Sequence, residues 1–187
     1  MATNTNTDPT ELLRMKNIAT SLVCVLALGA AMTATAQTKP APAAHAKHSQ
    51  PAAAAPQLDV AAAAQPAVTV VERFGQSLAA GDLKTVGTLL DADVLILETG
   101  GAERSREQYL GHHAIGDAQF LKGTHSELKH RRARIAGDLA WVGTESELQA
   151  SKDGKPLTLL STETMVLKKT GADWRIVHIH WSSRPKR

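Results

Sequence analysis

The chain is poor in cysteine and in aromatic residues. Cys24 is the only cysteine among 187 residues, and it lies within an N-terminal apolar segment. A mature protein without that segment would form no disulfide and would use no cysteine as a nucleophile or metal ligand. The sequence also has no glycine-rich phosphate loop and no G-x-S-x-G elbow. These absences exclude thiol enzymes, thiolate metal sites, P-loop nucleotide binding and the usual serine hydrolases.

The chain also has little excess of one charge over the other. The formal net charge is +3, which is too small to indicate a nucleic acid or an acidic membrane as the partner. The most basic stretch, residues 129–134, alternates, so its charges are expected on both faces of a strand. Glu145 and Glu147 on the next strand are expected to pair with them. Expected export and the small number of aromatic residues (3%) also argue against nucleic-acid binding.

Residues 1–36 have the organisation of a signal peptide. Arg14 and Lys16 precede an apolar run at 18–32, and the small-x-small pattern at 34–36 ends before Gln37. The run is short and rich in alanine, so it is not expected to be a membrane span or a stable anchor. We expect cleavage near Ala36 and a periplasmic or secreted mature protein.

Two further boundaries divide the chain. Met15 is an alternative start of translation, in which case residues 1–14 would not be part of the protein. Residues 37–66 are dominated by alanine and proline and are expected to form a disordered linker, because they offer too little apolar area to bury. The folded domain is expected at 67–184.

The folded domain shows a change of period along its length. Helical spacing of apolar residues predicts a helix that ends near Gly81, and Asp82 is placed to cap a second one. Residues 94–97 are expected to form a short apolar strand, and Ser105 with Gln108 is a capping box for a third helix. Gly111 and Gly116 weaken this helix, so a break into two pieces is expected. Alternation then predicts four strands at 126–136, 139–149, 157–168 and 173–182. This order is typical of an α+β fold with helices on one face of a curved antiparallel sheet.

The last strand carries two histidines at alternating positions. Regular alternation from Trp174 places His178 and His180 on the inner face. The same alternation places Val177, Ile179 and Trp181 on the outer face, where they would form an apolar patch for a homodimer.

Two stretches resemble the nuclear transport factor 2-like superfamily, which includes ketosteroid isomerases and SnoaL-like cyclases. They are AAGDLKTVGTLLDADVLIL near the start of the domain and GADWRIVHIHWSS in its last strand. The resemblance implies a cone: a curved mixed sheet wrapped around three N-terminal helices, with a cavity open at one end and dimers through the outer sheet face. The isomerase mechanism of that group uses an aspartate base beside a tyrosine and a protonated aspartate. Tyr109 is the only tyrosine here, and the isomerase motif is not matched residue by residue.

A set of polar residues is expected in that cavity. As catalytic residues we predict His113 and Asp117, which lie one helical turn apart, with His180 and Glu98 assisting. Asp117 would orient His113 as a general base, and no cofactor is required. As ligand-binding residues we predict Tyr109, Glu103, Trp141, Trp174 and His178.

Three functions remain open from the sequence. The first is an exported domain that binds a small apolar or amphipathic molecule, with isomerase-, cyclase- or lyase-type acid–base chemistry. The second is a non-catalytic dimeric binding or scaffold module. The third is a zinc or copper site made by His113, Asp117, His178 and His180.

Overall fold

The computed structural model describes residues 54–187, which belong to one compact unit, Gln50–Arg187. The predicted signal peptide, its cleavage site, the alternative start Met15 and most of the predicted linker lie outside the described residues. None of the helices within 54–187 is both long and apolar enough to cross a membrane.

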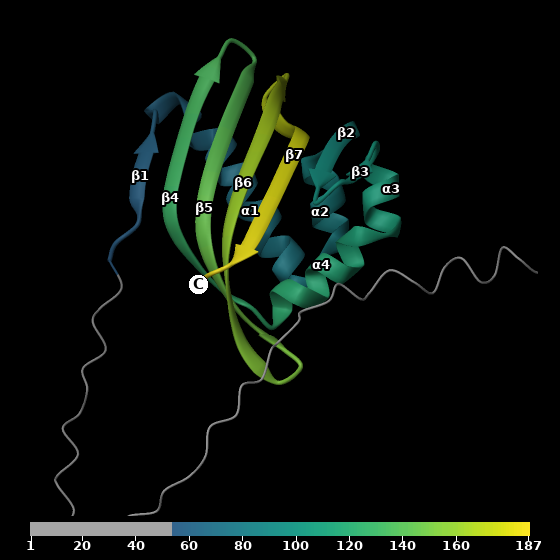
Figure 1. Cartoon of the computed structure of the whole chain (residues 1–187). Coiled ribbons are helices and arrows are strands. Elements are labelled where there is room, and N and C mark those ends of the chain that lie inside the picture. Colours follow the sequence, from purple (N-terminus) through teal and green to yellow (C-terminus); the bar gives the residue numbers. More distant parts are fainter. Residues whose placement is uncertain (1–53) are drawn as a thin grey trace, which may run out of the picture. The chain divides into compact units, whose positions relative to one another are not determined.

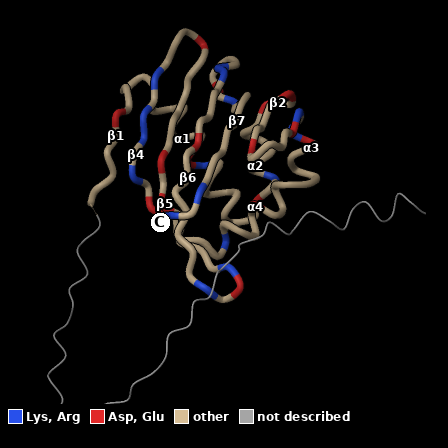
Figure 2. The backbone as a smooth tube through the Cα atoms, viewed as in Figure 1, with Lys and Arg blue, Asp and Glu red and all other residues tan. Residues whose placement is uncertain are grey.

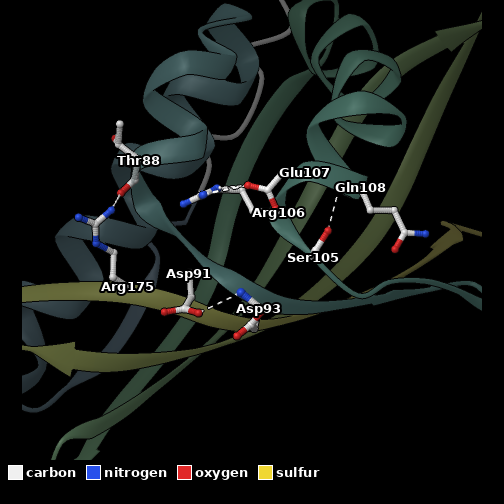
Figure 3. A network of polar contacts seen from close by, with 8 residues as sticks. All are labelled: Thr88, Asp91, Asp93, Ser105, Arg106, Glu107, Gln108 and Arg175. Atoms are coloured by element: carbon white, nitrogen blue, oxygen red, sulfur yellow. Dashed lines mark hydrogen bonds and ion pairs between the residues drawn. The ribbon is translucent and has the colours of Figure 1, made fainter.

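The helices begin and end close to where the sequence predicts. Their bounds are Ala62–Ala64 (η2, a 3₁₀ turn), Gln65–Ala80 (α1), Leu83–Leu89 (α2), Arg106–Gly111 (α3) and His113–Lys122 (α4). Gly81 ends α1 with a φ of 75°, and Asp82 caps α2 by accepting a hydrogen bond from the Thr85 amide at 3.0 Å. The Ser105 hydroxyl accepts from the Gln108 amide at 3.1 Å at the start of α3 (Figure 3). The third helix does break in two, as predicted.

The strands form one seven-stranded mixed sheet in the order β1-β4-β5-β6-β7-β2-β3. Their bounds are Gln57–Val60 (β1), Leu90–Glu98 (β2), Gly101–Glu103 (β3), His125–Ala136 (β4), Leu139–Lys152 (β5), Lys155–Thr170 (β6) and Asp173–Pro185 (β7). Strands β4 to β7 are antiparallel neighbours, whereas β1 runs parallel to β4 and β2 parallel to β7. The expected α+β fold with a curved mixed sheet is confirmed.

The helices lie on the concave side of the long strands β4–β7 (Figure 1). Helix α1 packs against β5 and β7, and α4 packs against α1. The core between them contains Phe74 and Leu78 from α1, and Ile96, Met165 and Ile179 from the sheet, all at most 2% exposed. We call the face of the sheet that meets the helices the inner face. An arginine of β7, Arg175, also donates to the Thr88 carbonyl at the end of α2 (Figure 3).

The domain begins earlier than predicted. Residues 57–60, which the composition assigned to the linker, form the edge strand β1 beside β4. Asp59 holds this strand in place, since its carboxylate accepts from Arg134 at 2.8 Å and forms an ion pair with Arg132 at 3.1 Å. Figure 2 shows the corresponding basic residues along β4 and the acidic one on β1. Arg132 and Arg134 therefore pair with β1, whereas Arg131 pairs with Glu72 of α1 and Lys129 with Glu127. Among residues 54–187, no ion pair joins this basic stretch to Glu145 or Glu147, contrary to the prediction.

The prediction for the two faces of the last strand is wrong for its second half. Opposite β6, Val166 pairs with His178 and Leu167 pairs with Ile176, so Val177 is an extra residue in β7. Such a β-bulge reverses the alternation that follows it. Ile179 is consequently fully buried on the inner face, while His178 and His180 point to the outer one.

Candidate functional site

One row of side chains crosses the inner face of the sheet. Successive Cα partners on neighbouring strands are Arg131 (β4), Thr144 (β5), Glu163 (β6), Trp181 (β7) and Glu98 (β2). We call these five residues the inner row. Partners directly opposite each other on one face have Cβ atoms about 5 Å apart. The fold therefore joins residues from five strands into one line of polar and aromatic groups.

Two bulges put the inner row together. The bulge at Val177 brings Trp181 to the inner face. A second bulge lies in β4, where Leu128 pairs with Ser146 but His130 pairs with Glu145, so that Lys129 is the extra residue. It turns Arg131 inward, and that side chain is only 11% exposed. Without these bulges the arginine and the tryptophan would face outward.

The inner row lies against an open pocket of about 710 Å³. All five of its residues line this pocket, together with Phe74 and Leu78 of α1 and Asp117 and Phe120 of α4. On the other side of the row, the next residues of the inner face are buried and apolar: Ala133, Val142, Met165, Ile179 and Ile96. The row therefore forms the floor of the pocket, above a sealed core. Serines and leucines line the sheet beyond it, including Leu128, Ser146, Leu148, Leu159 and Ser161.

Two carboxyl groups meet at the β2 end of the row. Burial, and then the nearby Asp117, raises the pKa of the Glu98 carboxyl. Burial also raises the pKa of Asp117, although a hydrogen bond from the Tyr109 hydroxyl, 2.9 Å away, opposes this shift. Burial and the same aspartate raise the pKa of Tyr109 well above its usual range, so the phenol remains a donor. Both carboxyl groups therefore keep their protons to a higher pH than ordinary carboxyl groups do.

The structure does not form the predicted His113–Asp117 pair. His113 lies beside Glu103, and its Nδ1 atom forms an ion pair with Glu103 Oε1. The His113 side chain is 61% exposed and does not line the pocket, whereas the carboxyl of Glu103 is buried. Asp117 pairs with Tyr109 instead. His113 and Asp117 do lie one turn apart in α4, but the carboxylate of Glu103 at the end of β3 lies beside the imidazole and pairs with it instead.

A basic group lies at the β4 end of the row. Arg131 Nη1 donates to Glu72 Oε1 of α1 at 2.6 Å. Between the two ends, the Trp181 indole donates to Glu163 Oε2 at 2.8 Å. Burial raises the pKa of Glu163. The Trp181 ring lies 6.3 Å from that of Phe74 and 6.2 Å from that of Tyr109, measured between centroids.

Besides His113, four predicted site residues lie away from the pocket. Trp141 is 39% exposed on the outer face, and His180 is exposed there as well. His178 is on the same face and lies 2.8 Å from the Leu95 carbonyl through its Nδ1 atom. Trp174 is buried in the core, away from the pocket lining. Of the predicted residues, Glu98 and Asp117 line the pocket, with Tyr109 and Glu103 behind them.

The structure does not bring together the four residues of the alternative metal site. His178 and His180 lie on the outer face, away from Asp117. Within residues 54–187 there is no group of three or more His, Asp or Glu side chains close enough to share a metal ion.

Sequence reasoning missed Arg131, Thr144 and Glu163 as pocket residues. Glu163 could have been found, because it shares the alternation of Met165 and Leu167, which are apolar and buried. Thr144 likewise alternates with Ala140 and Val142. Arg131 has no such signal, since the bulge at Lys129 breaks the alternation of its strand.

Comparison with known proteins agrees with this architecture. A protein from Shewanella frigidimarina described as a "putative ketosteroid isomerase" is 35% identical, with a TM-score of 0.63, over 66% of this chain and 99% of that one. A CaMKII hub from S. rosetta is 22% identical (TM-score 0.57; 66% and 98% covered), and an NTF2-like protein from Pseudomonas putida KT2440 is 18% identical (0.55; 65% and 86%). These two show the fold alone. No curated protein matches the chain.

The family model of the SnoaL-like domain matches residues 68–185, which contain the whole inner row, helix α4 and most of helix α1. The chain therefore belongs to the SnoaL-like family of the nuclear transport factor 2-like superfamily.

Proposed function

We propose that this protein is an exported domain that binds a small amphipathic molecule in the pocket above the inner row. The observation that carries the proposal is the pocket itself: about 710 Å³, with apolar walls and a polar floor. Pockets of this size with a few convergent polar groups are typical of small-molecule sites. The basic n-region and apolar run at residues 1–36 support export.

Proton transfer is the chemistry that the pocket supports best. Glu98 and Asp117 both line it, and burial raises the pKa of each. A carboxylate with a raised pKa is a stronger base than an ordinary one and needs no cofactor. The Tyr109 hydroxyl donates to Asp117 and so fixes its orientation. In this proposal Glu98 removes a proton from the bound molecule or returns one to it. Asp117 is the second carboxyl group of the pocket and lies near Glu98.

Filling the pocket should abolish uptake of apolar molecules. Ser161 lines the pocket beside Ser146 of the next strand. Ser161→Trp places an indole in the space that a ligand needs, and we expect the affinity for 1-decanol to fall by about tenfold or more. Isothermal titration calorimetry measures the change.

Ser151→Trp is the matched control, because Ser151 is exposed at the end of the β5–β6 hairpin. It should bind 1-decanol as the unmodified protein does. Binding that is equal in the unmodified protein and both variants would place the ligand outside this pocket.

Self-association is a second candidate function, and a row on the outer face favours it. Trp141 pairs with Val166, Val166 with His178, and His178 with Leu95. Trp141 and Leu95 are large apolar side chains that are 39% and 38% exposed. The matching hub and association domains of CaMKII are named for assembly. We propose that a second copy of this chain covers this outer row. In this proposal the row replaces Val177, Ile179 and Trp181, the residues predicted from the sequence to form the dimer interface.

A charge on this outer row should weaken the dimer. Trp141→Lys removes an exposed aromatic side chain from the row and adds a cation there. The association constant of the dimer should therefore fall at least about tenfold. Ile115→Lys is the control, because Ile115 is 48% exposed but lies on α4. Sedimentation equilibrium over a range of concentrations reads out both. A monomer at all concentrations, or equal dimers in both variants, would refute the interface.

A further inference from the structure

Two polar atoms at the β4 end of the pocket lack a hydrogen-bond partner. They are Nε of Arg131 and Oγ1 of Thr144, both buried and both outside hydrogen-bond geometry with any group among residues 54–187, although both residues act on the neighbouring Glu163 carboxyl and oppose the rise of its pKa. The two residues are directly opposite each other on β4 and β5, and both line the pocket. A buried donor without an acceptor is costly, and folded proteins rarely retain one without a reason.

We propose that Arg131 and Thr144 form a binding site for the carboxylate group of an amphipathic acid. This inference rests on the proposed function of the pocket and names the class of its ligand. A carboxylate has two acceptor oxygens, and here it meets two donors, the Nε–H of the guanidinium and the hydroxyl of the threonine. Hydrogen bonds between a guanidinium and a carboxylate are charge-assisted and stronger than neutral ones.

The ion pair of Arg131 with Glu72 uses Nη1 and leaves the Nε–H of the guanidinium available. Its Nη1 atom donates to Glu72, whose side chain is 45% exposed, so solvent screens that ion pair. Glu163 is the next charged residue along the row, and one of its oxygens already accepts from Trp181. Burial raises the pKa of Glu163, whereas Trp181, Arg131 and Thr144 oppose this shift.

The distribution of apolar residues indicates where the rest of the ligand lies. Beyond the inner row, the sheet offers Leu128, Leu148 and Leu159 to the pocket, and α4 offers Phe120 from the opposite side. A hydrocarbon chain that starts at Arg131 can lie along these residues. The acidic end of the row, at Glu98, is four strands away at about 4.8 Å per strand. An anionic end group at Arg131 is therefore separated from the acidic pair.

The test compares decanoate with 1-decanol at pH 8, where the acid is ionised. Isothermal titration calorimetry of the full chain should show tighter binding of decanoate. Arg131→Gln should lower the affinity for decanoate by about tenfold or more and leave that for 1-decanol within about twofold. Thr144→Val keeps the shape of the side chain, removes only the hydroxyl, and should lower decanoate affinity severalfold. It therefore tests the site even if Arg131→Gln fails to fold.

Arg132→Gln is the matched control, because Arg132 is exposed and pairs with Asp59 outside the pocket. It should change neither affinity. Equal binding of decanoate and 1-decanol, unaltered by both pocket variants, would overturn the carboxylate site and leave the pocket function standing. If neither compound binds the unmodified protein, the pocket function fails, and the carboxylate site fails with it.

Discussion

Ile179→Ala is expected to lower the free energy of unfolding by about 2–5 kcal/mol, whereas His180→Ala should change it by less than about 0.5 kcal/mol. The neighbouring residues differ because the bulge at Val177 turns Ile179 into the core, where it is fully buried between Met165 and Ile96. Removing a buried side chain costs its transfer free energy and leaves a cavity. His180 lies on the exposed face, so its removal leaves no cavity.

Urea denaturation followed by circular dichroism measures both changes. The comparison distinguishes the bulged strand from a regular one, since regular alternation from Trp174 would bury His180 and expose Ile179. A larger loss for His180→Ala than for Ile179→Ala would show that the strand has no bulge. Ile176→Ala serves as a reference, because Ile176 is buried before the bulge and should cost as much as Ile179.

Glu98→Gln is expected to abolish most of the base activity of the pocket. A suitable probe is 5-nitrobenzisoxazole, in which a base removes one C–H proton as the N–O bond breaks to give a cyanophenolate. No cofactor takes part, and the coloured product is followed by absorbance. A positioned carboxylate base typically contributes at least about a hundredfold. We expect Glu98→Gln to lose about tenfold or more of the rate with this small probe.

The pH dependence follows from the direction of the pKa shift. Burial and Asp117 raise the pKa of Glu98, and only the ionised carboxylate can accept the proton. The rate should therefore rise as the pH increases through this raised pKa and then level off. Glu145→Gln, on the outer face of β5, should leave the rate and its profile unchanged. A rate that is the same in Glu98→Gln would assign the proton transfer to another group.

Much of the fold could be predicted from local patterns. The change from helical to alternating spacing, the cap residues Asp82 and Ser105, and the glycines at the hairpin turns lie within a few residues of the structures that they produce. The strand β1 was not predictable in this way. Its four residues pair only with β4, about seventy positions later, and their alanine- and proline-rich surroundings hide them.

The candidate site could be predicted only in part. Glu98 was predicted because it ends an apolar strand that faces the core, and Asp117 because it lies on the apolar face of a helix. The histidines were misplaced, since the prediction did not foresee that Glu103 of β3 pairs with His113, and it assumed regular alternation for His178 and His180. Arg131 was read as part of a basic strand surface, and the bulge beside it turned it inward.

From α1 onward, the sequence by itself determined the order of helices and strands, the turns and the family, because each of these depends on short-range chemistry and spacing. The tertiary structure alone decided which side chains share the pocket. Side chains on a strand alternate with a period of two, so a single extra residue moves every later side chain to the opposite face. Lys129 and Val177 are such residues, and their bulges form only when β4 and β7 pair with their neighbours. The inner row from Arg131 to Glu98 is therefore a product of strand pairing.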